Sequence, residues 1–448
     1  MRFVSTRDPA VSAGLAEALE QGLAPDGGLY VPSEWPTFSP QQLTERLAAG
    51  PAPIRPGESL LSARALASIA TEVLEPFAAG SRLAPHLQAI AADAFNFDAP
   101  LVPLEPGGRL SVLGLIHGPT AAFKDFGARF LAASLARLRT PGGRTLTILV
   151  ATSGDTGGAV AAAFHGRPGI EVVVLYPKGL VSPTQERQLT CWDGNVRTFA
   201  VRGTFDDCQR IVKEALLDPT LRERRDLSSA NSINLGRLLP QVVYYAAASL
   251  AVWRAHGAPA SFVVPAGNLG NSLACLWARK LGLPVAEVVL AFNANQTVPD
   301  FLRTGTWEPH PSVATLASAM DVGNPSNMER VRSLFATLGE LRGAFDADTV
   351  DDEHIRTRIR TVFERYGRIL CPHTAVAAEA YERLPAERRR AGHWVIVGTA
   401  HAAKFREIVE PLIGRPLAMP ESLGELFTRP VRSGEIAPQL AALRRALD

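Results

Sequence analysis

From about residue 100 onward, short runs of β-branched residues alternate with alanine-rich segments of helical periodicity. Strands that alternate with helices indicate βαβ units, which build parallel sheets covered on both faces. Glycine-containing loops follow several strand candidates, and ligands bind such sheets at the carboxyl ends of their strands. The sequence therefore predicts an α/β fold. The strand candidates are Leu146–Val150, Glu171–Tyr176, Val196–Val201, Ser261–Pro265, Val288–Phe292 and Trp394–Val397.

The region before this alternation has a different pattern. Within residues 1–85, Leu15–Leu23 and Leu60–Leu74 have helical spacing, so this region is predicted to be rich in helices. The longest strongly apolar run, Val242–Trp253, is too short for the roughly 20 residues that cross a bilayer. It is predicted to be a buried helix. The N-terminus lacks the basic and apolar regions of a secretory signal.

Charge and cysteine usage exclude several classes of function. The 46 basic and 44 acidic side chains leave a formal net charge of +2, which gives no electrostatic reason to expect nucleic acid or an anionic membrane as a partner. The four cysteines fit neither a zinc motif nor a redox motif, and a chain of 448 residues needs no disulfides to fold. We therefore expect no metal site and a cytoplasmic location.

Only five of the 46 basic residues are lysines, and one of them has an unusual setting. Lys124 lies in the segment His117–Phe126, between Phe123 and Phe126 at a predicted helix start. Burial and the helix dipole should lower its pKa, which is how a nucleophilic or Schiff-base amine is prepared. The alternative is an ordinary lysine paired with Asp125. Lys404 follows a predicted buried strand, so it is the other lysine expected near a pocket.

Three loops are suited to anions, because each places small or polar residues at a predicted helix start. The loop at 267–271 lacks the Lys-Ser/Thr of a nucleotide-binding P-loop, which disfavours nucleotides. Each loop could also be a capped turn without a ligand, but three in one chain indicate more than one anionic group. A reactive lysine, a phosphate-binding loop and no metal pattern together point to pyridoxal 5′-phosphate. The loops are Ala151–Gly158, Ser229–Arg237 and Gly267–Asn271.

The segment His117–Asp125 resembles the cofactor-lysine motif of the threonine synthases, which are fold-type-II pyridoxal-phosphate enzymes. The long N-terminal region and the Lys124-Asp125 pair are similar to the branch found in yeasts and many bacteria. Two positions depart from the family's pattern: Ala402 stands where proline is expected, and Leu235-Gly236 replaces a bulkier pair. Both departures affect the expected rigidity of their loops. The other similar segments occur in the family's order and are Pro25–Pro32, Thr152–Gly158, Ala230–Arg237, Gly267–Asn271, Ala319–Asn327 and Gly398–His401.

The resemblance implies two open parallel-sheet lobes and an α-rich N-terminal region at residues 1–85. Residues 86–135 and 240–448 would form the large lobe that binds the cofactor. Residues 136–239 would form a small lobe that closes over the substrate.

The resemblance also implies a role for each matching residue. Lys124 would bind pyridoxal phosphate covalently, and Thr399 would contact its ring nitrogen. The cofactor phosphate would be held by Gly267, Asn268, Leu269, Gly270 and Asn271. The substrate would be bound by Ser153, Asp155, Thr156, Asn231, Ser232, Arg237 and Asn271.

The implied reaction converts O-phospho-L-homoserine and water to L-threonine and phosphate, the last step of threonine biosynthesis. The expected partner is therefore a small-molecule substrate, and the chain is expected to be a monomer. Another pyridoxal-phosphate enzyme, such as a serine or threonine deaminase or a phospho-lyase, would share Lys124 and the loop at 267–271 without needing Arg237. An inactive regulatory relative of these enzymes is a further alternative.

Overall fold

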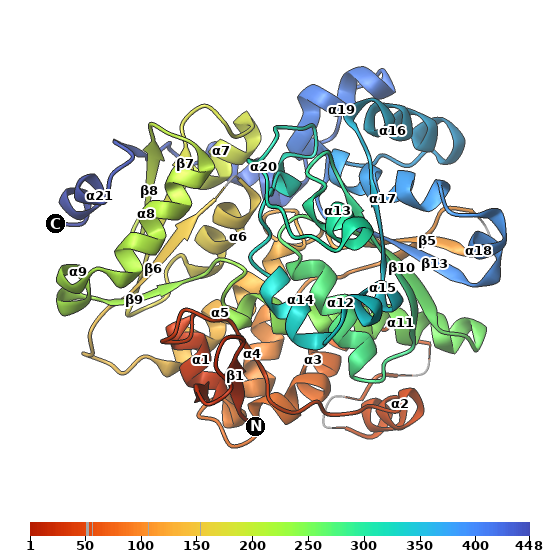
Figure 1. The fold of residues 1–448 in the computed structure, drawn as a ribbon, viewed down its shortest axis with the longest axis horizontal. Coiled ribbons are helices and arrows are strands. Elements are labelled where there is room, and N and C mark those ends of the chain that lie inside the picture. Colours follow the sequence, from red (N-terminus) through yellow and green to blue (C-terminus); the bar gives the residue numbers. More distant parts are fainter. Residues whose placement is uncertain (51–52, 56, 106, 153) are drawn as a thin grey trace.

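The computed structural model spans residues 1–448 and describes all of them except residues 51–52, 56, 106 and 153. Two sheets, in separate lobes, dominate the molecule (Figure 1). The six-stranded sheet is parallel except for its edge pair β4 and β5, which is antiparallel. Its strands are, in order, β12 (Asp346–Thr349), β11 (Val285–Phe292), β10 (Ala260–Pro265), β13 (His393–Gly398), β5 (Leu110–Gly114) and β4 (Leu101–Pro103).

The second sheet is parallel throughout. Its strand order is β14 (Gly434–Ile436), β8 (Val196–Val201), β7 (Ile170–Pro177), β6 (Leu146–Ala151) and β9 (Asp226–Ser229). The C-terminal strand β14 therefore returns to this sheet, although residues 240–448 were predicted to belong to the other lobe. The division into a large and a small lobe otherwise stays a prediction.

Both sheets are covered on both faces, as their β-branched sequences predict. Along β10, Phe262 and Val264 face the largest hydrophobic core, whereas Val263 between them faces a second core. Along β6, Ile148 and Leu149 divide in the same way between the largest core and a third one. This alternation follows from the two-residue period of a strand. The α/β fold predicted from the sequence is confirmed.

The N-terminal region contains the predicted helices and also a small sheet. Strands of two or three residues form it in the antiparallel order β2 (Ser12–Ala13), β1 (Phe3–Ser5) and β3 (Tyr30–Pro32). Such short strands leave no periodic pattern in the sequence, and they were not predicted. The helices are α1 (Leu15–Gln21), α2 (Pro40–Ala49), α3 (Ala63–Ala78) and α4 (Leu87–Ala94).

The long apolar segment is a core helix, as predicted. Helix α11 (Val242–His256) follows α10 (Leu235–Leu238) and the short 3-10 helix η2 (Leu239–Gln241). The continuous helical segment from Leu235 to His256 is long and apolar enough to cross a membrane, but 94% of its most apolar window is buried in the protein. The surrounding side chains therefore account for its apolar composition.

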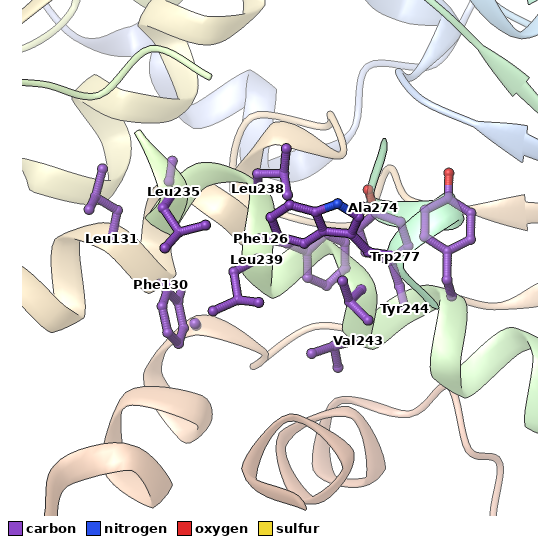
Figure 2. Packing of buried hydrophobic residues seen from close by; sticks show 14 of the residues in the cluster. Phe126, Phe130, Leu131, Leu235, Leu238, Leu239, Val243, Tyr244, Ala274 and Trp277 are labelled. Carbon is purple, nitrogen blue, oxygen red and sulfur yellow. The ribbon is translucent and has the colours of Figure 1, made fainter. Parts of the chain in front are cut away.

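Trp277 lies at the centre of the packing between these helices and α5 (Lys124–Leu138) (Figure 2). Its side chain projects from α12 (Gly270–Lys280) and is fully buried. Figure 2 shows its indole ring among Leu238, Val243 and Tyr244.

Replacing Trp277 with alanine should destabilise the protein by about 3–5 kcal/mol, because it removes a large buried side chain and leaves a cavity. Urea unfolding followed by circular dichroism measures this change. A loss below about 1 kcal/mol would show that the neighbouring side chains collapse into the space.

Candidate active site

Lys124 is the first residue of α5 and points away from its neighbour Asp125. The Asp125 carboxylate instead accepts hydrogen bonds from the Thr120 amide, at 2.9 Å, and the Thr120 hydroxyl, at 2.6 Å. Lys124 Nζ lies 3.9 Å from Asp155 Oδ2, on the other lobe. The alternative of an ordinary Lys124–Asp125 pair is therefore not what the structure shows.

Asp155 is buried and holds two lysines at once. It begins α6 (Asp155–Phe164), directly after β6. Besides Lys124, its carboxylate binds Lys404 Nζ at 2.7 Å and accepts a 3.0 Å hydrogen bond from Gln185 Nε2. Burial alone would raise the pKa of Asp155, but the ammonium groups of Lys404 and Lys124 outweigh it and hold that pKa well below its usual range.

The environment of Lys124 favours its neutral amine. Burial is the largest influence and lowers the pKa to about 8; Asp155 opposes this effect, while Lys404 and Arg237 add to it. The Lys124 ammonium also lies 5.6 Å from the centre of the Phe123 ring. A larger fraction of neutral amine than an exposed lysine carries suits a nucleophile or a proton acceptor.

Thr399 follows strand β13 and lies beside the lysine loop. Its carbonyl accepts a 2.9 Å hydrogen bond from the Phe123 amide, and its own amide donates to Thr374 Oγ1 at 3.3 Å. Its hydroxyl is buried, and it has no hydrogen-bond partner among the residues that the structure describes. A buried hydroxyl of this kind needs a partner, and a ring nitrogen of a cofactor would supply one.

The loop at 267–271 connects β10 to α12, as predicted. Tyr244 and Tyr245 donate hydrogen bonds to Asn271 Oδ1, at 2.6 and 2.9 Å. They fix the orientation of the amide, whose Nδ2 is buried and finds no partner within the described part of the chain. The buried hydroxyl of Ser272 is unpaired in the same sense. Unpaired donors at the start of an 11-residue helix fit a phosphate group.

A second motif packs against this loop. A Cβ on Gly267 would lie 2.8 Å from Met320 Cα, so only glycine allows the two segments to approach this closely. Asn268 Oδ1 accepts hydrogen bonds from the amide and hydroxyl of Ser326, at 2.6 and 2.9 Å. The Ala319–Asn327 segment, which the sequence singled out, therefore shapes the loop at 267–271.

Asn231 forms its hydrogen bonds within the five-stranded lobe, whereas Ser232 connects that lobe to the other one. The Asn231 amide bonds to the backbone of Ala151, with Nδ2 donating at 2.8 Å and Oδ1 accepting at 3.3 Å. Ser232 Oγ accepts hydrogen bonds from Asn268 Nδ2 at 2.8 Å and from Asn327 Nδ2 at 3.2 Å. The predicted roles of both residues in binding substrate stay predictions.

Arg237 is a buried cation that has no acidic partner within 4.0 Å among the described residues. It lies on α10, where its Nη1 donates to the carbonyl of Ala230. Its Nε finds no partner in the described part of the protein. Burial lowers its pKa to about 10, with a smaller opposing influence of Asp125. A buried guanidinium with unused donors is suited to an anionic ligand.

The loop before α6 is only partly described. Thr152 Oγ1 accepts hydrogen bonds from the amides of Gly154 and Gly157, both at 2.9 Å, and so caps the start of α6. Thr156, in the first turn, is half-buried. Ser153 was predicted to bind substrate, but it lies outside the described residues.

Two buried residues at the site were not predicted from the sequence. His373 is the second residue of α17 (Pro372–Glu382), and its Nε2 accepts a 3.0 Å hydrogen bond from the Ala319 amide. Burial is the main reason that its pKa falls to about 4, so the ring is neutral. Arg330 is fully buried, and its donors reach Ser232 O, Asn327 Oδ1, Ile233 O and Tyr30 O at 2.6–3.0 Å. Neither residue belongs to a recognisable local motif.

The two-lobed α/β fold, the half-buried amine of Lys124 and the unpaired donors at α12 are the features of a pyridoxal-phosphate enzyme. A family model described as pyridoxal-phosphate dependent enzyme matches residues 98–399. Models of the threonine synthase N-terminus and C-terminal region match residues 2–95 and 374–447. The chain belongs to the threonine synthase family, and the fold type, cofactor and family predicted from the sequence are confirmed.

Full-length relatives agree with this assignment. The chain is 39% identical to threonine synthase of Escherichia coli, with 100% of this chain and 99% of that protein covered. The crystal structure of the Escherichia coli enzyme has a TM-score of 0.87 at 37% identity, covering 100% of this chain and 99% of that one. A structure of threonine synthase from Brucella melitensis with bound pyridoxal phosphate also has a TM-score of 0.87, at 32% identity, covering 100% and 98%.

Proposed function

We propose that the chain converts O-phospho-L-homoserine and water to L-threonine and inorganic phosphate. The observation that carries this proposal is a set of unpaired buried donors on two elements of the described chain, α12 and α10. Those on α12 belong to Asn271 and Ser272, and that on α10 belongs to the buried guanidinium of Arg237. A phosphorylated cofactor and a phosphorylated substrate together need two groups of such donors.

Bound pyridoxal phosphate supplies a conjugated ring that takes up the electron pair left on an amino-acid substrate when a proton leaves its Cα. Lys124 would hold this cofactor through Nζ. Its lowered pKa leaves a larger fraction of the amine neutral, and only the neutral amine can accept the Cα proton. Thr399 offers a neutral hydroxyl to the ring nitrogen. Residues 267–271 hold the cofactor phosphate.

Arg237 binds the substrate phosphate in this proposal, together with Asn231 and Ser232. Its planar guanidinium can donate two parallel hydrogen bonds to the phosphate, both before and after the phosphate leaves Cγ. The ionised carboxylate of Asp155 would repel the substrate carboxylate. We therefore assign the backbone start of α6 and Thr156 to that group, and closure of the lobe at 136–239 to the exclusion of water.

The proposed function is tested by incubating the purified protein, loaded with cofactor, with O-phospho-L-homoserine. We expect inorganic phosphate and threonine to appear in equal amounts. Phosphate release accompanied by a 2-oxo acid would instead indicate a phospho-lyase, and a protein that binds no cofactor would indicate a regulatory relative.

The remaining expectations concern partners and location. We propose that the chain acts in the cytoplasm as a monomer, with its small-molecule substrate as its partner and without nucleic acid or membrane. The near-balanced charge supports the part of this proposal that excludes nucleic acid and an anionic membrane as partners. Sedimentation equilibrium at micromolar concentration should give the mass of one chain, 47.9 kDa, and a value twice as large would contradict it.

A further inference from the structure

Lys404 is the one fully buried lysine among the residues that the structure describes. It lies on the short 3-10 helix η4 (Ala402–Phe405), just after Thr399. Its Nζ makes two contacts, 2.7 Å to Asp155 Oδ1 and 2.9 Å to the carbonyl of Thr120. The first contact reaches the other lobe, and the second reaches the loop that carries Lys124. Lys404 therefore joins three segments at the cofactor site.

The two lysines share one carboxylate unequally. Lys404 Nζ lies 2.7 Å from Asp155 Oδ1, whereas Lys124 Nζ lies 3.9 Å from Asp155 Oδ2. Gln185 donates a further hydrogen bond to Oδ1 and helps to hold the carboxylate toward Lys404. An isolated buried carboxylate beside Lys124 would favour the protonated amine, which cannot attack an aldehyde.

We propose that Lys404 is a positioning residue: it binds the Asp155 carboxylate and thereby keeps the Lys124 amine free to bind the cofactor. This inference rests on the proposed role of Lys124. The charges around the amine on every side are consistent with it. Asp155 comes from α6, Lys404 from η4 and Arg237 from α10; His373 on α17 is neutral, and Asp125 on α5 is held by Thr120.

The test measures how fast the cofactor-free protein binds pyridoxal 5′-phosphate at different pH values, followed by the absorbance of the protein-bound cofactor. Binding joins Lys124 Nζ to the aldehyde carbon and releases one water, so its rate follows the fraction of neutral amine. In Lys404→Met, the Asp155 carboxylate has only Lys124 as a cationic partner among the described residues. The acid limb of the pH profile, where the binding rate rises with pH, should therefore move up by about one pH unit. The rate at pH 7 should then fall about tenfold.

Two further variants separate charge from packing. Asp155→Asn removes the carboxylate and leaves Lys124 beside a cation, so the acid limb should move down by about one pH unit. Lys404→Arg keeps the positive charge, and its profile should stay close to that of the native protein. Lys280→Met is the matched control, because it removes an exposed lysine at the end of α12 and should leave the profile unchanged.

A folded Lys404→Met protein with an unchanged acid limb would overturn the proposal. If that variant does not fold, Asp155→Asn decides the question, since an acid limb that stays or moves up would overturn the proposal as well. The titration of the cofactor itself is common to all variants. Failure of the native protein to bind the cofactor at any pH would refute the proposed role of Lys124 instead, so the two outcomes remain distinct.

Discussion

Replacing Lys124 with alanine is expected to abolish covalent binding of pyridoxal phosphate and to lower the rate of threonine formation by ~10⁴-fold or more. The reason is that the proposed reaction requires a primary amine at this position, first to bind the cofactor and then to carry a proton. The surroundings of Lys124 are suited to both tasks, because burial lowers the pKa of its amine to about 8 and the Asp155 carboxylate lies 3.9 Å from Nζ. The measurements are the absorbance spectrum and phosphate release from O-phospho-L-homoserine.

Lys124→Arg makes this test sharper, because arginine keeps the positive charge and much of the side-chain length but cannot bind the aldehyde. It should be as inactive as Lys124→Ala. Lys178→Ala serves as the control: Lys178 is exposed and paired with Glu435 on the surface, so full activity is expected. An active Lys124→Arg protein would show that the residue acts only through its charge.

The strands buried on both faces could be predicted closely from the sequence. Strand β8 has the predicted bounds Val196–Val201, and β6 is one residue longer than predicted. Their continuous runs of β-branched and apolar residues reflect burial on both sides. The sequences of edge strands lack such runs, because edge strands pack on fewer neighbours. Strand β12, which reads Asp-Ala-Asp-Thr, and the three-residue β14 were missed for that reason.

The loops of the site could be placed from the sequence, but the contacts between them could not. Lys124, Thr399 and the loop at 267–271 each belong to a local motif. The pairing of Lys404 with Asp155 depends on how the two lobes meet, which no local pattern encodes. Arg330 is a comparable case: its fully buried guanidinium fixes the loop at Ser232 through backbone carbonyls. Its position on a helix near Asn327 does not distinguish it from a surface arginine.

Replacing Arg237 with methionine is expected to lower kcat/KM for O-phospho-L-homoserine by ~100-fold or more, because each charged hydrogen bond to the phosphate contributes roughly 1.5–3 kcal/mol. Methionine keeps much of the apolar stem, so the variant should still bind the cofactor when it is supplied at a saturating concentration. The thermal midpoint of unfolding distinguishes a ligand-binding arginine from a structural one more specifically. Arg237 is buried with no ion-pair partner among the described residues, and its removal leaves only the carbonyl of Ala230 without a donor. Loss of the unpaired buried charge offsets that cost, so the thermal midpoint in phosphate-free buffer should change little.

Arg330→Met is the comparison variant, because the same substitution is expected to have a different effect on thermal stability. Arg330 is equally buried, but its donors bond to Tyr30 O, Ser232 O, Ile233 O and Asn327 Oδ1. Methionine would leave these acceptors unpaired, at about 1–3 kcal/mol each, so the thermal midpoint should fall clearly. A fall of the same size in Arg237→Met would mean that Arg237, too, is a structural residue, and that the substrate phosphate is bound elsewhere. Stability retained together with a collapse of kcat/KM is the outcome that only a ligand-binding arginine explains, because its unused donors are matched by the substrate and not by the protein.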